Sequence, residues 1–131
     1  MGILFELGID TSDIKNMLEL CPLIRDMSDD EIKKKIDILS FIGCNVRHIK
    51  NILVSNPYYL DRIDSDILEL ISFLKEIGIS NIYLLFDSNP YLLNKDKFEI
   101  EEYINSKIEL GLSMDDIIDE FESNPYIIDE F

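Results

Sequence analysis

Hydrophobic residues recur along this chain with a helical period, in blocks that repeat about every 35 residues. Between Gly43 and Pro57, the apolar residues Ile49, Ile52 and Leu53 are spaced i, i+3 and i+4, which places them on one face of a helix. The other three blocks carry a similar stripe at Ile14, Met17 and Leu18, at Ile82, Leu85 and Phe86, and at Ile117 and Phe121. The pattern therefore predicts one amphipathic helix per block, which we call the first helix.

A second, longer helix is predicted between each proline and the next glycine. Counting back from Gly43, apolar residues stand eleven, seven and one positions before it, at Ile32, Ile36 and Ile42. Ser28 precedes this stripe with Glu31 three residues later, which is the pattern of a capping box. The same spacing recurs before Gly78. Each block thus contains two helices.

Glycine and proline mark the joins between these helices at nearly constant spacing. The glycines are Gly8, Gly43, Gly78 and Gly111, and the prolines are Pro22, Pro57, Pro90 and Pro125. Glycine suits the left-handed backbone just past a helix end, and the residue before proline avoids the helical region, so proline ends the first helix. Two residues after each glycine stands a predicted N-cap, namely Asp10, Asn45, Ser80 or Ser113. The string Ser-Asn-Pro-Tyr occurs three times, and we predict that its asparagine caps the following turn.

These units predict an all-α fold. Neither helix of a unit can bury its apolar stripe alone, so the units are expected to stack into an α-solenoid of right-handed type. We expect a single domain over residues 1–131, with residues 1–6 as the tail of an incomplete preceding helix. Its repeats are predicted at 7–41, 42–76 and 77–109, followed by a partial repeat at 110–131.

The charge balance is strongly acidic. Twelve basic residues stand against 27 acidic ones, which makes the formal net charge −15. Such a charge repels phosphate at long range, which disfavours nucleic acid and permits a basic protein partner. The sequence shows no secretory leader and no apolar run of membrane-spanning length, and its two cysteines form no metal-binding pattern. We expect a cytoplasmic protein with no membrane association.

The lines IGCNVRHIKNILVSNPYYL and LGLSMDDIIDEFESNPYII show the repeat most completely. Apolar-Gly, a capping residue, a spaced isoleucine and Pro-x-x-Leu at this period resemble the repeat of the mitochondrial transcription termination factor (mTERF) family. The resemblance implies a superhelix of two-helix repeats with a short 3₁₀ turn near each proline. It also implies nucleic-acid binding through a basic concave face. This sequence departs from that expectation because it is acidic and shows no basic ladder.

Two sets of residues are candidates for partner binding. Arg47, His48 and Lys50 cluster at the start of one first helix, and Lys33, Lys34 and Lys35 lie on the helix before it. They form either a phosphate-binding patch or ordinary solvated faces, and we favour the second interpretation. Tyr58, Tyr91 and Tyr126 share one position of the repeat. They either grip a peptide or stack on bases, or else form a packing ladder, which is the interpretation that we favour.

Residues 110–131 contain seven acidic residues and no basic one. This segment is either a docking face for a basic partner, a nucleic-acid mimic, or a polar cap on the last repeat. We favour the cap because Glu120 stands where the other repeats carry an apolar residue.

No catalytic pattern is visible in the sequence. His48 is the single histidine, and there is no Gly-rich phosphate loop, nucleophile elbow or zinc spacing. We therefore expect no catalytic, cofactor-binding or metal-ligating residues. The sequence favours a non-catalytic binding module with a protein partner, and the alternatives are nucleic-acid binding and self-association through the end repeats.

Overall fold

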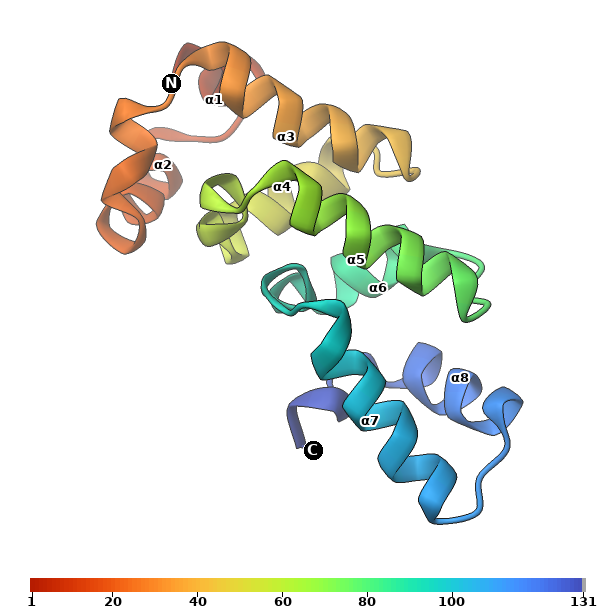
Figure 1. Ribbon diagram of the computed structural model, residues 1–131. Helices are drawn as coiled ribbons and strands as arrows, with labels where there is room; N and C mark the ends of the chain where they lie inside the picture. Colours follow the sequence, from red (N-terminus) through yellow and green to blue (C-terminus); the bar gives the residue numbers. More distant parts are fainter. Residues whose placement is uncertain (131) are drawn as a thin grey trace. The chain divides into compact units, whose positions relative to one another are not determined.

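The computed structural model describes residues 1–130, and every element in that range is helical (Figure 1). The first helices are α2 (Thr11–Leu20), α4 (Val46–Ser55), α6 (Ile82–Ser88) and α8 (Met114–Ser123). The second helices are α3 (Asp29–Phe41), α5 (Asp64–Glu76) and α7 (Lys97–Glu109), and a short α1 (Gly2–Glu6) precedes them all. The 3₁₀ helices are η1 (Pro22–Asp26), η2 (Pro57–Asp61), η3 (Pro90–Asn94) and η4 (Ile127–Glu130). The predicted all-α repeat fold is confirmed, while Phe131 lies outside the described residues.

The glycine turns have the backbone that the sequence predicts. The φ angles of Gly8, Gly43, Gly78 and Gly111 are 93°, 114°, 104° and 93°. After α5, for example, the N–H of Ile79 donates to the carbonyl of Leu74 over 3.1 Å, while the N–H of Gly78 donates to that of Lys75. This pattern closes the end of a helix around a left-handed residue. Each second helix therefore stops where glycine permits the turn.

The proline turns end the first helices as predicted. The residue before proline leaves the helical region, and Asn56, for example, has φ −135° and ψ 73°. Pro57 then occupies the first turn of η2, where its missing N–H leaves no hydrogen bond unmade. Cys21, Asn89 and Asn124 adopt nearly the same angles before their prolines.

Three of the four predicted N-caps are formed. The side chains of Asp10, Asn45 and Ser113 accept hydrogen bonds from backbone N–H groups three residues later, at 2.8, 2.9 and 3.2 Å. The hydrogen bond from the N–H of Asp13 is the main cause of the lowered pKa of the Asp10 carboxyl. The prediction for Ser80 is wrong: α6 begins one residue later, with Asn81 at its N-cap position and no side-chain bond. The shortened Gly78–Ile82 segment leaves no room for the usual cap.

The chain divides into two compact units, residues 1–64 and 65–131. In the first unit, like elements of successive repeats lie side by side, with α2 beside α4, η1 beside η2 and α1 beside α3. Its fully buried core includes Leu4, Ile24, Ile32, Leu39, Ile52 and Leu53. The apolar stripes are thus buried between repeats, as the solenoid arrangement requires.

In the second unit, α7 packs against α8 and α6 packs against η3. Its core includes Ile67, Leu74, Phe86, Leu93, Ile100, Tyr103, Ile117 and Phe121. The repeat boundaries and the single domain expected from the sequence stay predictions. Among residues 1–130, no helix combines the length and apolar character needed to cross a bilayer.

Candidate binding surfaces

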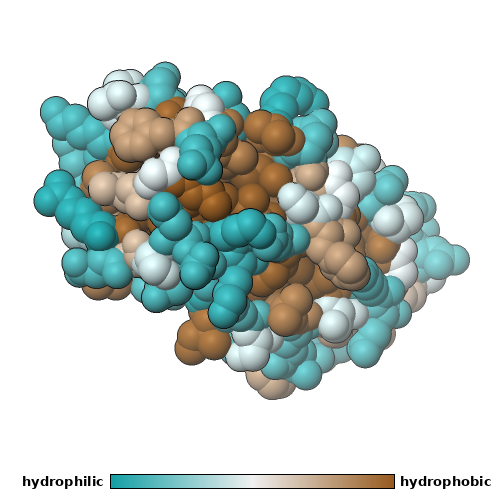
Figure 2. Space-filling view, turned by 90° about the horizontal axis from the view of Figure 1, so that it is seen from above, coloured by the Kyte–Doolittle hydropathy of each residue, from teal (hydrophilic) through white to brown (hydrophobic). Residues whose placement is uncertain are grey.

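The tyrosines that follow the prolines are exposed at the start of each turn. Tyr58, Tyr91 and Tyr126 are 43%, 49% and 48% exposed, and Leu23 occupies the same position in the first repeat. The next residue is buried in the first three repeats, as Ile24, Tyr59 and Leu92, whereas Ile127 after Tyr126 is half-buried. The short turn therefore presents one large side chain per repeat to solvent, which makes these tyrosines accessible to a partner. Hydrophobic side chains exposed among hydrophilic ones are also visible on the face shown in Figure 2.

In two of the three copies of the repeated string, the asparagine is buried and does not cap the turn. Asn56 and Asn89 are fully buried, and neither side chain makes a capping bond to the following 3₁₀ helix. Instead, Nδ2 of Asn89 donates to the carbonyl of Pro125 over 3.2 Å and to Oδ2 of Asp129 over 3.1 Å. The predicted cap is therefore wrong. Asn89 joins its own turn to the equivalent turn of the next repeat, a contact that spacing within one repeat cannot reveal.

The side chain of His48 takes part in the N-terminal cap of α4. This side chain is buried, and Nδ1 accepts a hydrogen bond from the backbone N–H of Asn45 over 3.1 Å. The side chain of Asn45 in turn accepts from the N–H of His48, so the two residues form a reciprocal capping box. The sequence pattern predicts a capping box at Ser28 but not this one, because histidine replaces the usual glutamate.

Arg47 and Lys50 lie near this cap but have different surroundings. Arg47 is exposed, whereas Lys50 is partly buried. Lys50 lines a groove with Gly8, Asp10 and Asp13, and its Nζ lies 3.4 Å from the position that a Cβ on Gly8 would take. The positive charge of Lys50 is thus partly offset by neighbouring carboxylates. Of the three clustered residues, Arg47 has the most exposed charge.

The three consecutive lysines of α3 do not form one patch. Nζ of Lys33 pairs with Asp37 at 3.0 Å, and Nζ of buried Lys35 pairs with Asp64 at 2.5 Å. Lys34 alone of the three is exposed without an ion pair to any residue in the range 1–130. Successive residues of a helix point about 100° apart, which separates the three charges.

Lys35 belongs to a buried polar contact that the sequence did not reveal. The hydroxyl of Tyr59 donates to the carbonyl of Lys35 over 2.6 Å. Burial, and secondarily the charge of Asp64, raises the pKa of Tyr59. The contact ties η2 to α3 within the first unit.

An ion pair joins α7 and α8 at two positions where the earlier repeats carry apolar residues. Lys107 stands at the repeat position of Leu39 and Leu74, and Glu120 at that of Met17, Ile52 and Leu85, all of which are buried. Nζ of Lys107 lies 3.3 Å from Oε1 of Glu120 and 5.7 Å from the centre of the Tyr103 ring. Burial, and then the charge of Glu120, raises the pKa of Tyr103 from 10.0 to about 12.

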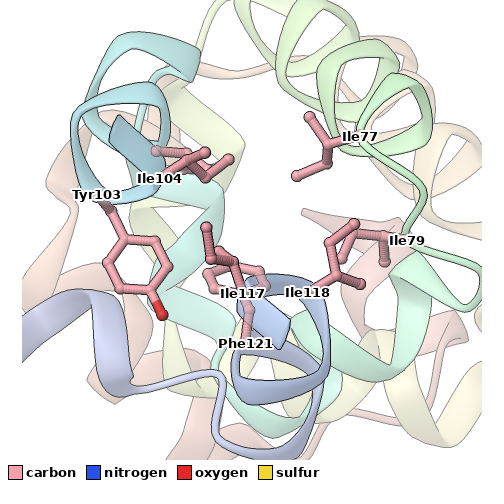
Figure 3. Close-up of a pocket in the computed structure, with 8 residues that line it drawn as sticks. Ile77, Ile79, Tyr103, Ile104, Ile117, Ile118 and Phe121 are labelled. Carbon is pink, nitrogen blue, oxygen red and sulfur yellow. The ribbon is translucent and has the colours of Figure 1, made fainter. Parts of the chain in front are cut away.

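The second unit also contains a small apolar cavity, which Tyr103 helps to line (Figure 3). Its lining includes Ile77, Ile104, Ile117 and Phe121, and the rings of Tyr103 and Phe121 lie 5.9 Å apart. It has barely room for one water molecule, and its walls offer almost no polar atoms. The cavity belongs to the core of the second unit.

The two units differ sharply in charge. Residues 1–64 contain eight basic and eleven acidic residues, a net charge of −3. Residues 65–131 contain four basic and sixteen acidic residues, a net charge of −12. Within residues 1–130, no group of three His, Cys, Asp or Glu side chains is placed to hold a metal ion. The excess of acidic residues gives the second unit a strongly negative electrostatic field.

Paired helices, proline turns and glycine turns in register define this chain as a helical-repeat protein. The model of the mTERF family matches residues 1–129, nearly the whole chain. The chain therefore belongs to the mTERF family, and the resemblance seen in the sequence is confirmed. Comparison with curated proteins found no match.

Proposed function

We propose that this chain is a non-catalytic helical-repeat module that binds a protein with a basic surface. The observation that carries the proposal is the net charge of −12 over residues 65–131. In that unit, Lys95, Lys97 and Lys107 are held in ion pairs with carboxylates. The field of this unit attracts cations and repels phosphate.

The exposed face of α8 supports this proposal. Asp115, Asp119 and Glu122 are spaced i, i+4 and i+7, so they share one side of the helix. All three are exposed, and none forms an ion pair with a residue that the structure describes. A basic partner would gain charge pairs along this face and associate faster at low salt.

Nucleic-acid binding is the second candidate, and it is the activity that membership of the mTERF family implies. The first unit holds eight of the twelve basic residues. Four of them are exposed and form no ion pair within the described range: Lys15, Arg25, Lys34 and Arg47. The first unit is therefore where nucleic acid would bind.

One experiment separates the two candidates. A tagged form of the protein is cross-linked in cells that express it, and the bound material is analysed with and without nuclease. We expect a protein partner that nuclease does not release. Reversing the charge of Asp115, Asp119 and Glu122 to lysine should remove that partner. The matched control reverses Glu6, Glu19 and Asp26, three exposed acids of the first unit.

A direct titration tests the nucleic-acid candidate. Labelled duplex and single-stranded DNA and RNA are titrated with the purified protein between about 50 and 200 mM salt. We expect no submicromolar binding. Submicromolar affinity that falls steeply with salt, and that Lys34→Glu with Arg47→Glu abolishes, would overturn the protein-partner proposal in favour of nucleic acid.

A further inference from the structure

The turns that carry Tyr91 and Tyr126 are held side by side by a buried hydrogen bond. Asn89 directly precedes Pro90-Tyr91, and its side chain donates to the carbonyl of Pro125, the residue directly before Tyr126. The same side chain also holds Asp129 beyond the second turn. The bond joins equivalent points of two successive repeats, so it sets the spacing of the two tyrosines.

Both rings face outward from this fixed base. Tyr91 and Tyr126 are 49% and 48% exposed, whereas Leu92, the residue after Tyr91, is 1% exposed. A large aromatic ring with few rotatable bonds loses little conformational entropy when it becomes a contact surface. Two such rings on a shared support form a pre-organised pair.

The spacing of neighbouring repeats suits one type of extended peptide. The Asn89–Pro125 hydrogen bond of 3.2 Å holds the two turns in contact, and packed helices lie about 8–10 Å apart, so we take about 8–10 Å as the separation of equivalent residues in these two turns. A polyproline-II segment has three residues per turn and rises about 3.1 Å per residue, which brings side chains i and i+3 to the same side about 9 Å apart. In a β-strand, residues i and i+3 point to opposite sides.

The negative charge of the second unit favours a basic peptide. The pair lies in the unit with a net charge of −12, and exposed Glu122 stands four residues before Tyr126. The faces of tyrosine rings attract cations, and arginine most often. We infer that Tyr91 and Tyr126 dock a basic polyproline-II segment with arginine at positions i and i+3. The inference rests on the proposed protein-binding function and names the segment recognised.

The first repeat supplies a matched variant. Leu23 occupies the position of Tyr91 and Tyr126, so leucine is compatible with this turn and removes the aromatic face. The probe is a fluorescein-labelled Arg-Pro-Pro-Arg-Pro-Pro-Arg peptide, measured by fluorescence anisotropy at low salt. We expect Tyr91→Leu with Tyr126→Leu to weaken binding about tenfold, and Tyr91→Phe with Tyr126→Phe to retain it within about threefold.

A second peptide of equal length and charge has its arginines at i and i+2, and we expect it to bind more weakly to the wild-type protein. Equal binding of the two peptides, or equal binding by the leucine and wild-type proteins, would overturn the tyrosine-pair inference. The proposed function would still stand in either case if the protein partner is recovered from cells and lost on reversing the α8 charges. Binding of single-stranded RNA that depends on the two tyrosines, with no peptide binding, would overturn both.

Discussion

Replacing Asn89 by alanine removes the side chain that joins two successive proline turns. Asn89 is fully buried and makes two hydrogen bonds, to Pro125 at 3.2 Å and to Asp129 at 3.1 Å. Without it, the carbonyl of buried Pro125 loses this donor and a small cavity opens. A buried group left without a partner costs about 1–3 kcal/mol. We therefore expect Asn89→Ala to lower the free energy of unfolding by about 2 kcal/mol, the middle of that range.

Asn124 is the matched control for this change. It occupies the same repeat position before Pro125 and has nearly the same backbone angles, but its side chain is exposed. Asn124→Ala should therefore cost about 0.5 kcal/mol or less. Asn89→Asp should cost more than Asn89→Ala at neutral pH, because an ionised carboxylate cannot donate to Pro125 and would face Asp129.

Urea unfolding followed by circular dichroism measures all three variants, and the slope of each transition shows whether the two units unfold together. If Asn89→Ala and Asn124→Ala lower the free energy of unfolding equally, the inter-repeat bond is refuted. If Asn89→Asp lowers it no more than Asn89→Ala does, donation by Nδ2 is not what stabilises this contact.

Three further predictions concern turns, caps and pH. Gly111 has φ 93°, and among the described residues none beyond its chain neighbours comes within 4 Å of the place that a Cβ would take. Gly111→Ala should therefore cost about 1–2 kcal/mol from backbone strain alone, measured by urea unfolding. His48→Ala keeps the hydrogen bond from its own N–H to the Asn45 side chain but loses the bond from the Asn45 N–H to the imidazole, and should cost about 1 kcal/mol. An unchanged thermal stability of this variant would contradict the capping role. The pKa of Tyr103 is raised from 10.0 to about 12, so the folded state holds this proton more tightly than the unfolded state. Its stabilisation is present below pH 10 and is lost as pH rises toward 12, and Tyr103→Phe should flatten that part of the stability curve.

Much of the fold could be predicted because its signals are local. A left-handed glycine such as Gly43, a proline such as Pro57 and a cap such as Asp10 act within a few residues of their own position. The spacing of these residues defined the repeat, and the repeat defined the family resemblance. The failed cap at Ser80 lies in the shortened Gly78–Ile82 segment, which disturbs this spacing.

The candidate sites were harder to predict because they depend on which distant residues meet. Lys35 looked like part of a basic run, but its partner Asp64 comes from the start of another helix and holds it in a buried pair. Lys107 replaces the leucine that the earlier repeats carry at its position, and Glu120 makes the complementary replacement on α8. Charge counted along the chain does not show which charges are neutralised by a neighbour.

The sequence by itself determined the two-helix repeat, its glycine and proline turns and its acidic balance, because each follows from residue type and spacing within about 35 residues. Only the tertiary structure decided the role of Asn89, the use of His48 in a cap and the exposure of Tyr91 and Tyr126. The physical reason is that burial and hydrogen bonding between repeats depend on the packing of segments far apart in the chain. That packing turned Asn89 into a tie between two repeats and left Tyr91 exposed to solvent.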